Sequence, residues 1–124
     1  MHKTGRGQKG ETMAALELEK EGMKIIARNI RSPAGEIDIV AIDGDILVFV
    51  EVKSWSSYSI EELEHAIDLK KQRRIIETAK YFLSSHREYN YMTLRFDVVF
   101  IGHKMGQTGE YTITHLESAF TEHI

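Results

Sequence analysis

Two apolar runs on either side of a short acidic turn constrain this chain most strongly. Residues 36–42 (EIDIVAI) and 46–54 (ILVFVEVKS) are rich in β-branched residues, and Asp43-Gly44-Asp45 stands between them. Asp-Gly between apolar runs is the strongest short-range signal for a β-hairpin. We therefore expect an antiparallel strand pair at the centre of the fold.

The rest of the chain predicts what surrounds this hairpin. The expected elements are a helix over 8–21 that stops at Gly22, a strand over 23–30, a short helix from a capping box at 59–62, a helix from 68 to about 84, a strand over 94–101, a loop over 102–109, an edge strand over 111–116 and a short terminal helix over 117–120. Without the short helices, the order is αβββ-α-ββ. It predicts the α/β class, with a mixed central sheet and flanking helices.

Composition and length exclude several classes of protein. The 124 residues contain no cysteine, which excludes disulfide scaffolds, thiol catalysis and Cys-ligated metals. The chain has no internal repeat and no Pro- or Ser-rich linker, so we expect one domain over residues 1–124. No run approaches the ~20 apolar residues of a membrane span and the start is polar, so we expect a cytoplasmic protein with no membrane partner.

Side chains alternate between the two faces of a strand, so each run of the hairpin divides into two sets. Along the second run, Glu51 and Lys53 share one face and the valines share the other. Along the first run, Glu36 and Asp38 point away from the apolar set. That apolar set is Ile37, Ile39 and Ala41.

Matching the two apolar sets fixes the register, because opposite residues of an antiparallel pair lie on the same face. Ile39 must face Val48 or a residue two positions away, and either choice puts Asp38 on the face of Glu51 and Lys53. We expect Asp38 directly opposite Glu51 with a four-residue loop, and diagonal to it with a two-residue loop. The core pattern thus brings three charged side chains into one cluster.

This cluster has the composition of a magnesium site. Two converging carboxylates suit Mg²⁺, for which Mn²⁺ can substitute, and the ion activates water and neutralises charge on a phosphate. A lysine two residues beyond Glu51 can hold that water or stabilise the anionic transition state. The pattern predicts phosphodiester hydrolysis. An equally weighted interpretation is a solvated sheet face on which Glu51 and Lys53 form a surface pair.

Three motifs in this order resemble the YraN-like family of small bacterial proteins: GEIDIVA (35–41), VFVEVK (48–53) and RFDVV (95–99). By fold that family is placed in the restriction-endonuclease-like superfamily, whose signature is D…(D/E)-x-K, and it is similar to archaeal Holliday-junction resolvases. The resemblance implies a restriction-endonuclease-like domain and a metal-dependent endonuclease that cuts branched or otherwise structured DNA. Resolvases cleave twice across a symmetric junction, so it also implies a homodimer.

The resemblance assigns roles position by position. Asp38 matches the metal-binding aspartate, Glu51 the second acid and Lys53 the lysine. Glu11 resembles an additional glutamate that reaches the metal directly or through water. Without the resemblance, Glu11 would be interpreted as a helix N-terminal acid favoured by the macrodipole. Glu36 is either a supporting ligand or a surface residue.

A basic run opens the second long helix, and we expect it to bind nucleic acid, DNA rather than RNA. The run is Lys70, Lys71, Gln72, Arg73 and Arg74. Four cations within five residues can contact several phosphates without reading sequence. The commoner outcome for any such run is a solvated helix face.

Two further functions stay open on the sequence. One is a nucleic-acid-binding module that has the nuclease fold but no efficient cleavage. The other is a protein-interaction domain that uses its acidic helices and Trp55, although Trp55 is better interpreted as a packing residue. Arg95 and Asp97 are interpreted as a buried support pair, and the six histidines as surface or satisfied residues.

Overall fold

The computed structural model describes residues 5–55, 67–103 and 111–122, which form a helix-flanked, five-stranded sheet. The elements are α1 (Gly5–Lys20), β1 (Lys24–Ser32), β2 (Gly35–Asp43), β3 (Ile46–Trp55), α3 (Leu69–Ser85), the 3-10 turn η1 (Arg87–Tyr89), β4 (Thr93–His103) and β5 (Tyr111–Phe120). The strands lie side by side in chain order. Strands β3 and β4 are parallel and the other neighbours antiparallel, so the predicted α/β class and mixed sheet are confirmed.

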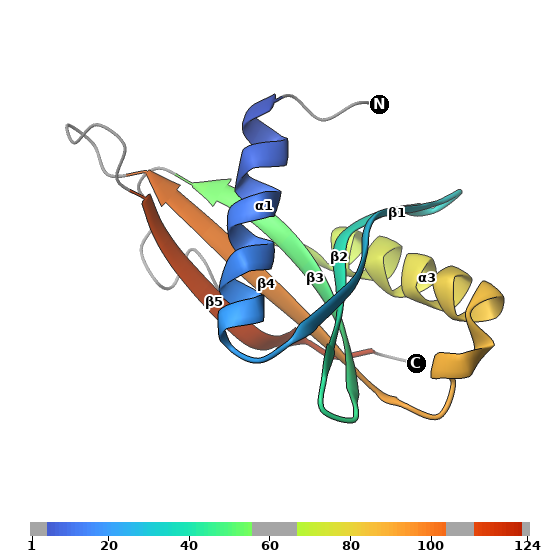
Figure 1. The fold of residues 1–124 in the computed structure, drawn as a ribbon. Coiled ribbons are helices and arrows are strands. Elements are labelled where there is room, and N and C mark those ends of the chain that lie inside the picture. The colour runs from blue at the N-terminus through green and yellow to red at the C-terminus, as the bar shows by residue number, and fades with distance from the viewer. Residues whose placement is uncertain (1–4, 56–66, 104–110, 123–124) are drawn as a thin grey trace.

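The two long helices cover opposite faces of this sheet, and each face has its own core (Figure 1). Under α1, Ala14 and Leu18 pack on Val48, Val50 and strand β4. The α3 core is aromatic, and its three central rings are Phe49, Phe82 and Phe96. The alternation of β3 is therefore realised: its valines face α1, while its other set faces α3, the helix with the basic run.

Helix α1 ends as the sequence predicts. Gly22 has φ 95°, and its N–H donates to the Glu19 carbonyl at 3.0 Å. The N–H of Met23 donates to the Leu18 carbonyl at 3.0 Å, and both of these side chains are buried in one core. This pattern of bonds is a Schellman cap, which needs the left-handed conformation that glycine adopts without strain.

Helix α3 also begins at the predicted residue. The Asp68 carboxylate caps it by accepting a hydrogen bond from the Lys71 backbone N–H at 2.8 Å. In its middle, the buried Thr78 hydroxyl lies 2.8 Å from the Ser32 hydroxyl at the end of β1. The cap thus fixes the start of α3, and the Thr78 contact joins the middle of the helix to the end of β1.

The β2–β3 register is one of the two that core matching allowed, with Ile39 opposite Val50. Asp43 and Ile46 form the last pair, so a two-residue turn, Gly44-Asp45, closes the hairpin. The expectation that this register needs a four-residue loop is wrong, because β2 continues one residue further than predicted, to Asp43, and pairs there with Ile46.

The apolar set of β2 is corrected at Ile37, which packs in the core under α3 while Ile39 packs under α1. Strand β1 explains the change of face: Arg28 pairs with Ile39 and Ile30 with Ile37, and Asn29 between them has φ 53°. This left-handed residue breaks the alternation in the strand next to Asp38.

The short terminal helix expected over 117–120 is wrong, since these residues are the end of β5. Phe120 pairs with Phe96 across the sheet, and their rings stack at 5.1 Å. Burial of this ring outweighs local propensity, and a register shift with Ser118 at φ 51° accommodates it. The helix expected from 59–62 and most of the 102–109 loop lie outside the described residues. Among those described, no helix is long and apolar enough to cross a membrane.

Candidate functional site

Asp38 lies where strands β2 and β3 separate. Their recorded pairing ends at Ile39 and Val50, and beyond it the Val52 backbone N–H donates to Asp38 Oδ2 at 2.7 Å. The carboxylate thus takes the place of a strand carbonyl. Asp38 is only 3% exposed, so its position is fixed by the backbone of β3 and by the surrounding core.

Glu51 is the carboxyl group next to Asp38, and its side chain is 12% exposed. Burial, together with the hydrogen bond and charge of the Asp38 carboxyl, raises the pKa of Glu51 to about 8; the nearby Lys71 ammonium opposes this rise in part. Two ionised carboxylates are therefore unfavourable here without a further cation. The predicted approach of Asp38 and Glu51 is present in the structure.

A lysine of α3 supplies one positive charge to this pair. Lys71 Nζ lies 3.1 Å from Glu51 Oε2, and the Lys71 side chain is 44% exposed. Oε2 is itself buried, and no donor in the described part of the chain meets hydrogen-bond geometry with it. The contact is thus an ion pair of close charges without a well-directed hydrogen bond.

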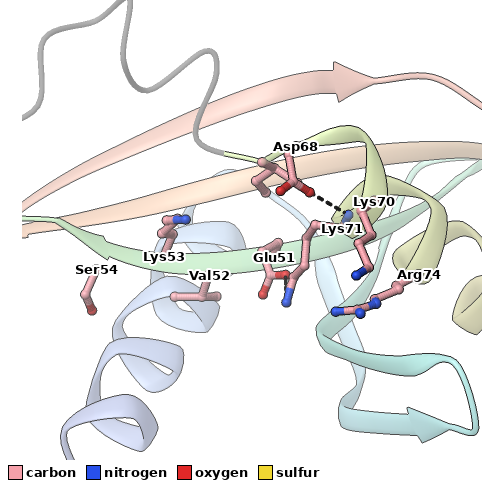
Figure 2. A pocket seen from close by; sticks show the side chains of 9 residues that line it. Glu51, Val52, Lys53, Ser54, Asp68, Lys70, Lys71 and Arg74 are labelled. Atoms are coloured by element: carbon pink, nitrogen blue, oxygen red, sulfur yellow. Dashed lines mark hydrogen bonds and ion pairs between the residues drawn. The ribbon is translucent and has the colours of Figure 1, made fainter.

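These groups open into a pocket of about 430 Å³ between β3 and the start of α3 (Figure 2). Its lining residues are Glu51, Val52, Lys53, Ser54, Ile67, Asp68, Lys70, Lys71 and Arg74. Figure 2 shows Lys71 reaching from α3 toward Glu51 on β3, with Lys70 and Arg74 on the same helix. The pocket thus has Glu51 and Lys53 on its β3 side and three cations on its α3 side, namely Lys70, Lys71 and Arg74.

The sequence of this chain matches a known family model. The description of that model is "Uncharacterised protein family UPF0102", and it matches residues 10–101. The chain belongs to this family. The matched range contains every residue of the pocket, and also Asp38 and Glu11.

Curated relatives of the same name are similar along most of their length. The UPF0102 protein of Treponema pallidum (strain Nichols) is 45% identical over 116 residues, which span 94% of this chain and 92% of the relative. That of Treponema denticola is 41% identical over 121 residues, 92% of this chain and 93% of the relative. That of Lachnoclostridium phytofermentans is 48% identical over 99 residues, which span 80% of this chain and 84% of the relative. The expected membership in a family of small bacterial proteins is confirmed at this level.

Glu11 of this UPF0102 chain lies on the other helix. It is completely buried in the second turn of α1, so the alternative of a first-turn acid that the macrodipole favours is wrong. Its Oε1 lies 3.5 Å from Arg28 Nε, and Arg28 pairs with Ile39, the neighbour of Asp38. Glu36 is 41% exposed and forms a surface ion pair with Arg31 at 3.7 Å.

The basic run of α3 divides between two surfaces. Lys70, Lys71 and Arg74 line the pocket beside Glu51. Gln72 and Arg73 instead line a second, smaller pocket of about 310 Å³, and Gln72 Nε2 donates to the Ile67 carbonyl at 3.0 Å. Helical spacing explains this division: Arg74 lies four residues after Lys70 and three after Lys71, and residues spaced in this way share a helix face. The smaller pocket is spaced alike, since Leu69 precedes Gln72 and Arg73 by three and four residues.

A second buried charge network lies on strands β4 and β5. Asp97 is 1% exposed, and Arg95 holds it through two bonds, Nε to Oδ1 at 2.9 Å and Nη2 to Oδ2 at 3.0 Å. His115 Nε2 lies 2.7 Å from Asp97 Oδ2, and the Ser118 N–H donates to Oδ1 at 3.0 Å. His115 Nδ1 lies 2.9 Å from Glu21 Oε1 beyond the end of α1. The network thus joins β4 and β5 to the turn after α1.

Neighbouring charges decide the protonation of this network. Burial alone lowers the pKa of His115, but Asp97 and Glu21 outweigh it and raise that pKa to about 9. Burial raises the pKa of Asp97, but bonds from His115, Arg95 and Ser118 outweigh it, so the net change is downward. The predicted support pair of Arg95 and Asp97 is present. The link from His115 to Asp97 was missed, because no local spacing connects two different strands.

Proposed function

We propose that this protein is a Mg²⁺-dependent nuclease of the restriction-endonuclease-like superfamily that hydrolyses phosphodiester bonds in branched or otherwise structured DNA. One observation carries the proposal. Two largely buried carboxyls, Asp38 and Glu51, are adjacent, and Glu51 lines a pocket with Lys53 and the basic start of α3. The D…E-x-K order on two neighbouring strands supports the superfamily.

The side chains fit a hard divalent cation. Both acids offer carboxylate oxygens, the ligand type that Mg²⁺ and Mn²⁺ prefer. The pKa of Glu51 is raised first by burial and then by the adjacent Asp38 carboxyl, and Lys71 offsets this rise only in part. Asp38 and Glu51 would hold the ion, and Glu11 would support it from α1. When bound, such an ion supplies an activated water and shields charge on the phosphate.

The other pocket residues have separate tasks in this proposal. Lys53 holds the attacking water in line with the phosphorus and stabilises the negative charge that develops on the phosphate oxygens. Lys70 and Arg74 bind phosphates on either side of the scissile bond and set the position of the strand. A homodimer, which would place two such pockets on one symmetric junction, stays a prediction.

A binding module that does not cleave is the second candidate function. One observation favours it: the Lys71 ammonium at 3.1 Å supplies a cation to Glu51 from the chain itself. Such a module would need no metal, so its acids would have no role in binding. Substituting Asp38 and Glu51 by neutral residues would then leave its affinity for nucleic acid unchanged.

A cleavage assay separates the two functions. Purified protein is incubated with four-way junction, duplex and single-stranded DNA and with RNA, in Mg²⁺, in Mn²⁺ or in EDTA. Wild-type protein should cut at least one substrate only with metal, and Asp38→Asn, Glu51→Gln and Lys53→Ala should abolish cutting. The matched control is Glu77→Gln, an exposed acid on the same helix as the basic run.

The outcomes are decisive. If wild-type protein cuts no substrate, or the Lys53→Ala protein cuts as well as wild type, the nuclease is abandoned. Unchanged DNA affinity in the Asp38→Asn and Glu51→Gln variants, measured by fluorescence anisotropy, would then support the binding module.

A further inference from the structure

The ion pair between Lys71 and Glu51 involves a carboxylate oxygen that, in the proposed function, would bind the metal. Glu51 Oε2 is buried, while the lysine that contacts it at 3.1 Å keeps 44% of its side chain exposed. A carboxyl fixed in the sheet is thus paired with a cation that has free access to solvent. The two partners differ in freedom, so the lysine is the one that can leave.

The backbone of α3 does not have to move for this departure. The Lys71 N–H is held by the Asp68 side chain at 2.8 Å, and the Gln72 N–H donates to the Asp68 carbonyl at 2.9 Å. The capped helix end fixes the lysine Cα, while its four-carbon stem rotates freely. Lys71 can therefore exchange partners by side-chain rotation alone.

The same pocket could hold a second partner for the Lys71 ammonium, a phosphate of the substrate. Lys70 and Arg74 line it on the solvent side of α3, and Arg74 lies three residues beyond Lys71, on the same helix face. A phosphodiester in the pocket meets these two cations, and a released Lys71 would add a third.

We propose that Lys71 is a positioning residue that pairs with Glu51 while the site lacks metal and moves to a substrate phosphate when a divalent cation binds the acids. This inference rests on the proposed function. A dication at Glu51 repels an ammonium held on the same oxygen, so the metal expels the lysine. The freed lysine then raises the affinity for nucleic acid, and by linkage the nucleic acid raises the affinity for metal by the same factor.

Metal binding without nucleic acid gives the first test. Mn²⁺ affinity is measured by calorimetry for wild-type protein, Lys71→Gln and the matched control Lys70→Gln, with circular dichroism as the check of folding. Loss of a half-exposed competing ion pair should tighten Mn²⁺ binding by about fivefold to tenfold in Lys71→Gln. The Lys70→Gln protein should stay within about twofold of wild type, since Lys70 contributes only long-range charge.

Nucleic-acid binding gives the second test. The probe is a duplex with phosphorothioate linkages, which resist hydrolysis, titrated with and without Mn²⁺. The factor by which Mn²⁺ increases the affinity should be smaller in Lys71→Gln than in wild type, and unchanged in Lys70→Gln. A merely structural Lys71 would leave this factor unchanged.

These readouts fail separately from the nuclease. If Lys71→Gln binds Mn²⁺ no more tightly than wild type, or neither protein binds it, the exchange is wrong whatever the cleavage assay shows. If the Lys71 exchange is observed and no substrate is cut, the proposed nuclease activity is wrong but the exchange is supported. The two tests of the exchange measure binding and do not require hydrolysis.

Discussion

Replacing His115 by glutamine should remove a contribution to stability that is present at neutral pH and lost at alkaline pH. His115 contacts the fully buried Asp97 carboxylate at 2.7 Å and Glu21 at 2.9 Å, and its pKa is raised from 6.5 to about 9. Because the folded state holds the proton more tightly, this contribution is complete below pH 6.5. It is lost as the pH rises through about 9.

The magnitude follows from this interval. Multiplying the interval between 6.5 and about 9 by about 1.4 kcal/mol per pH unit gives about 3 to 4 kcal/mol. Glu21 is 34% exposed, so solvent screens its share of the interaction and about 2 to 3 kcal/mol remains. The stability difference between wild type and His115→Gln should therefore shrink by that amount from pH 6 to pH 10.

Two assays measure this effect. Urea unfolding at intervals from pH 6 to pH 10 gives the free energy of unfolding of both proteins, and subtracting the two curves removes titrations that they share. NMR of the imidazole ring gives the pKa of His115 directly. The control is His86→Gln, since the recorded partners of His86 are the Phe82 carbonyl and Ser85. Titration of His115 near 6.5, or a difference that does not depend on pH, would refute the reasoning.

Three other predictions concern the core and the pocket. Phe49→Ala removes a 1%-exposed ring that contacts two other phenylalanine rings, and should cost about 3 to 5 kcal/mol in chemical denaturation, whereas a cost below 1 would contradict the packing. Glu51→Gln should make the metal-free protein about 1 to 2 kcal/mol more stable than wild type near pH 8, and the gain should be smaller near pH 5. The reason is that the raised pKa of Glu51 makes wild type lose stability as the pH rises from 4.5 to about 8. Calorimetry in EDTA measures both proteins, and a difference in melting temperature that is the same at the two pH values would contradict the prediction. Lys70→Ala should lower the slope of log affinity for DNA against log salt by about 0.7 to 0.9, measured by anisotropy, and an unchanged slope would remove Lys70 from the phosphate contacts.

Local pattern determined the order of elements and much of the site. The Asp-Gly turn, the alternation of β3 and the glycine after α1 each act within a few residues, so the hairpin, the face of Glu51 and the end of α1 could be predicted, and the register was narrowed to two choices. The approach of Asp38 to Glu51 followed from the same register, because strand pairing converts spacing in sequence into neighbourhood in space.

Tertiary packing decided the rest. Asn29 changes the face of Ile37, and the stacking of Phe120 on a ring of β4 keeps the end of the chain in the sheet, although local propensity favoured a helix there. Whether Lys71 or Arg73 reaches Glu51 depends on how α3 is turned against the sheet, which its buried side chains set. His115 meets Asp97 only because β4 and β5 pair.

The physical reason is the range of the interactions. Hydrophobic periodicity and turn geometry are written in consecutive residues, so the sequence by itself determined the strands, the helices and the acids that share a face. Charge pairing between elements depends on distances of a few ångströms between side chains far apart in the chain. Only the tertiary structure decided which cation pairs with Glu51 and which histidine contacts Asp97.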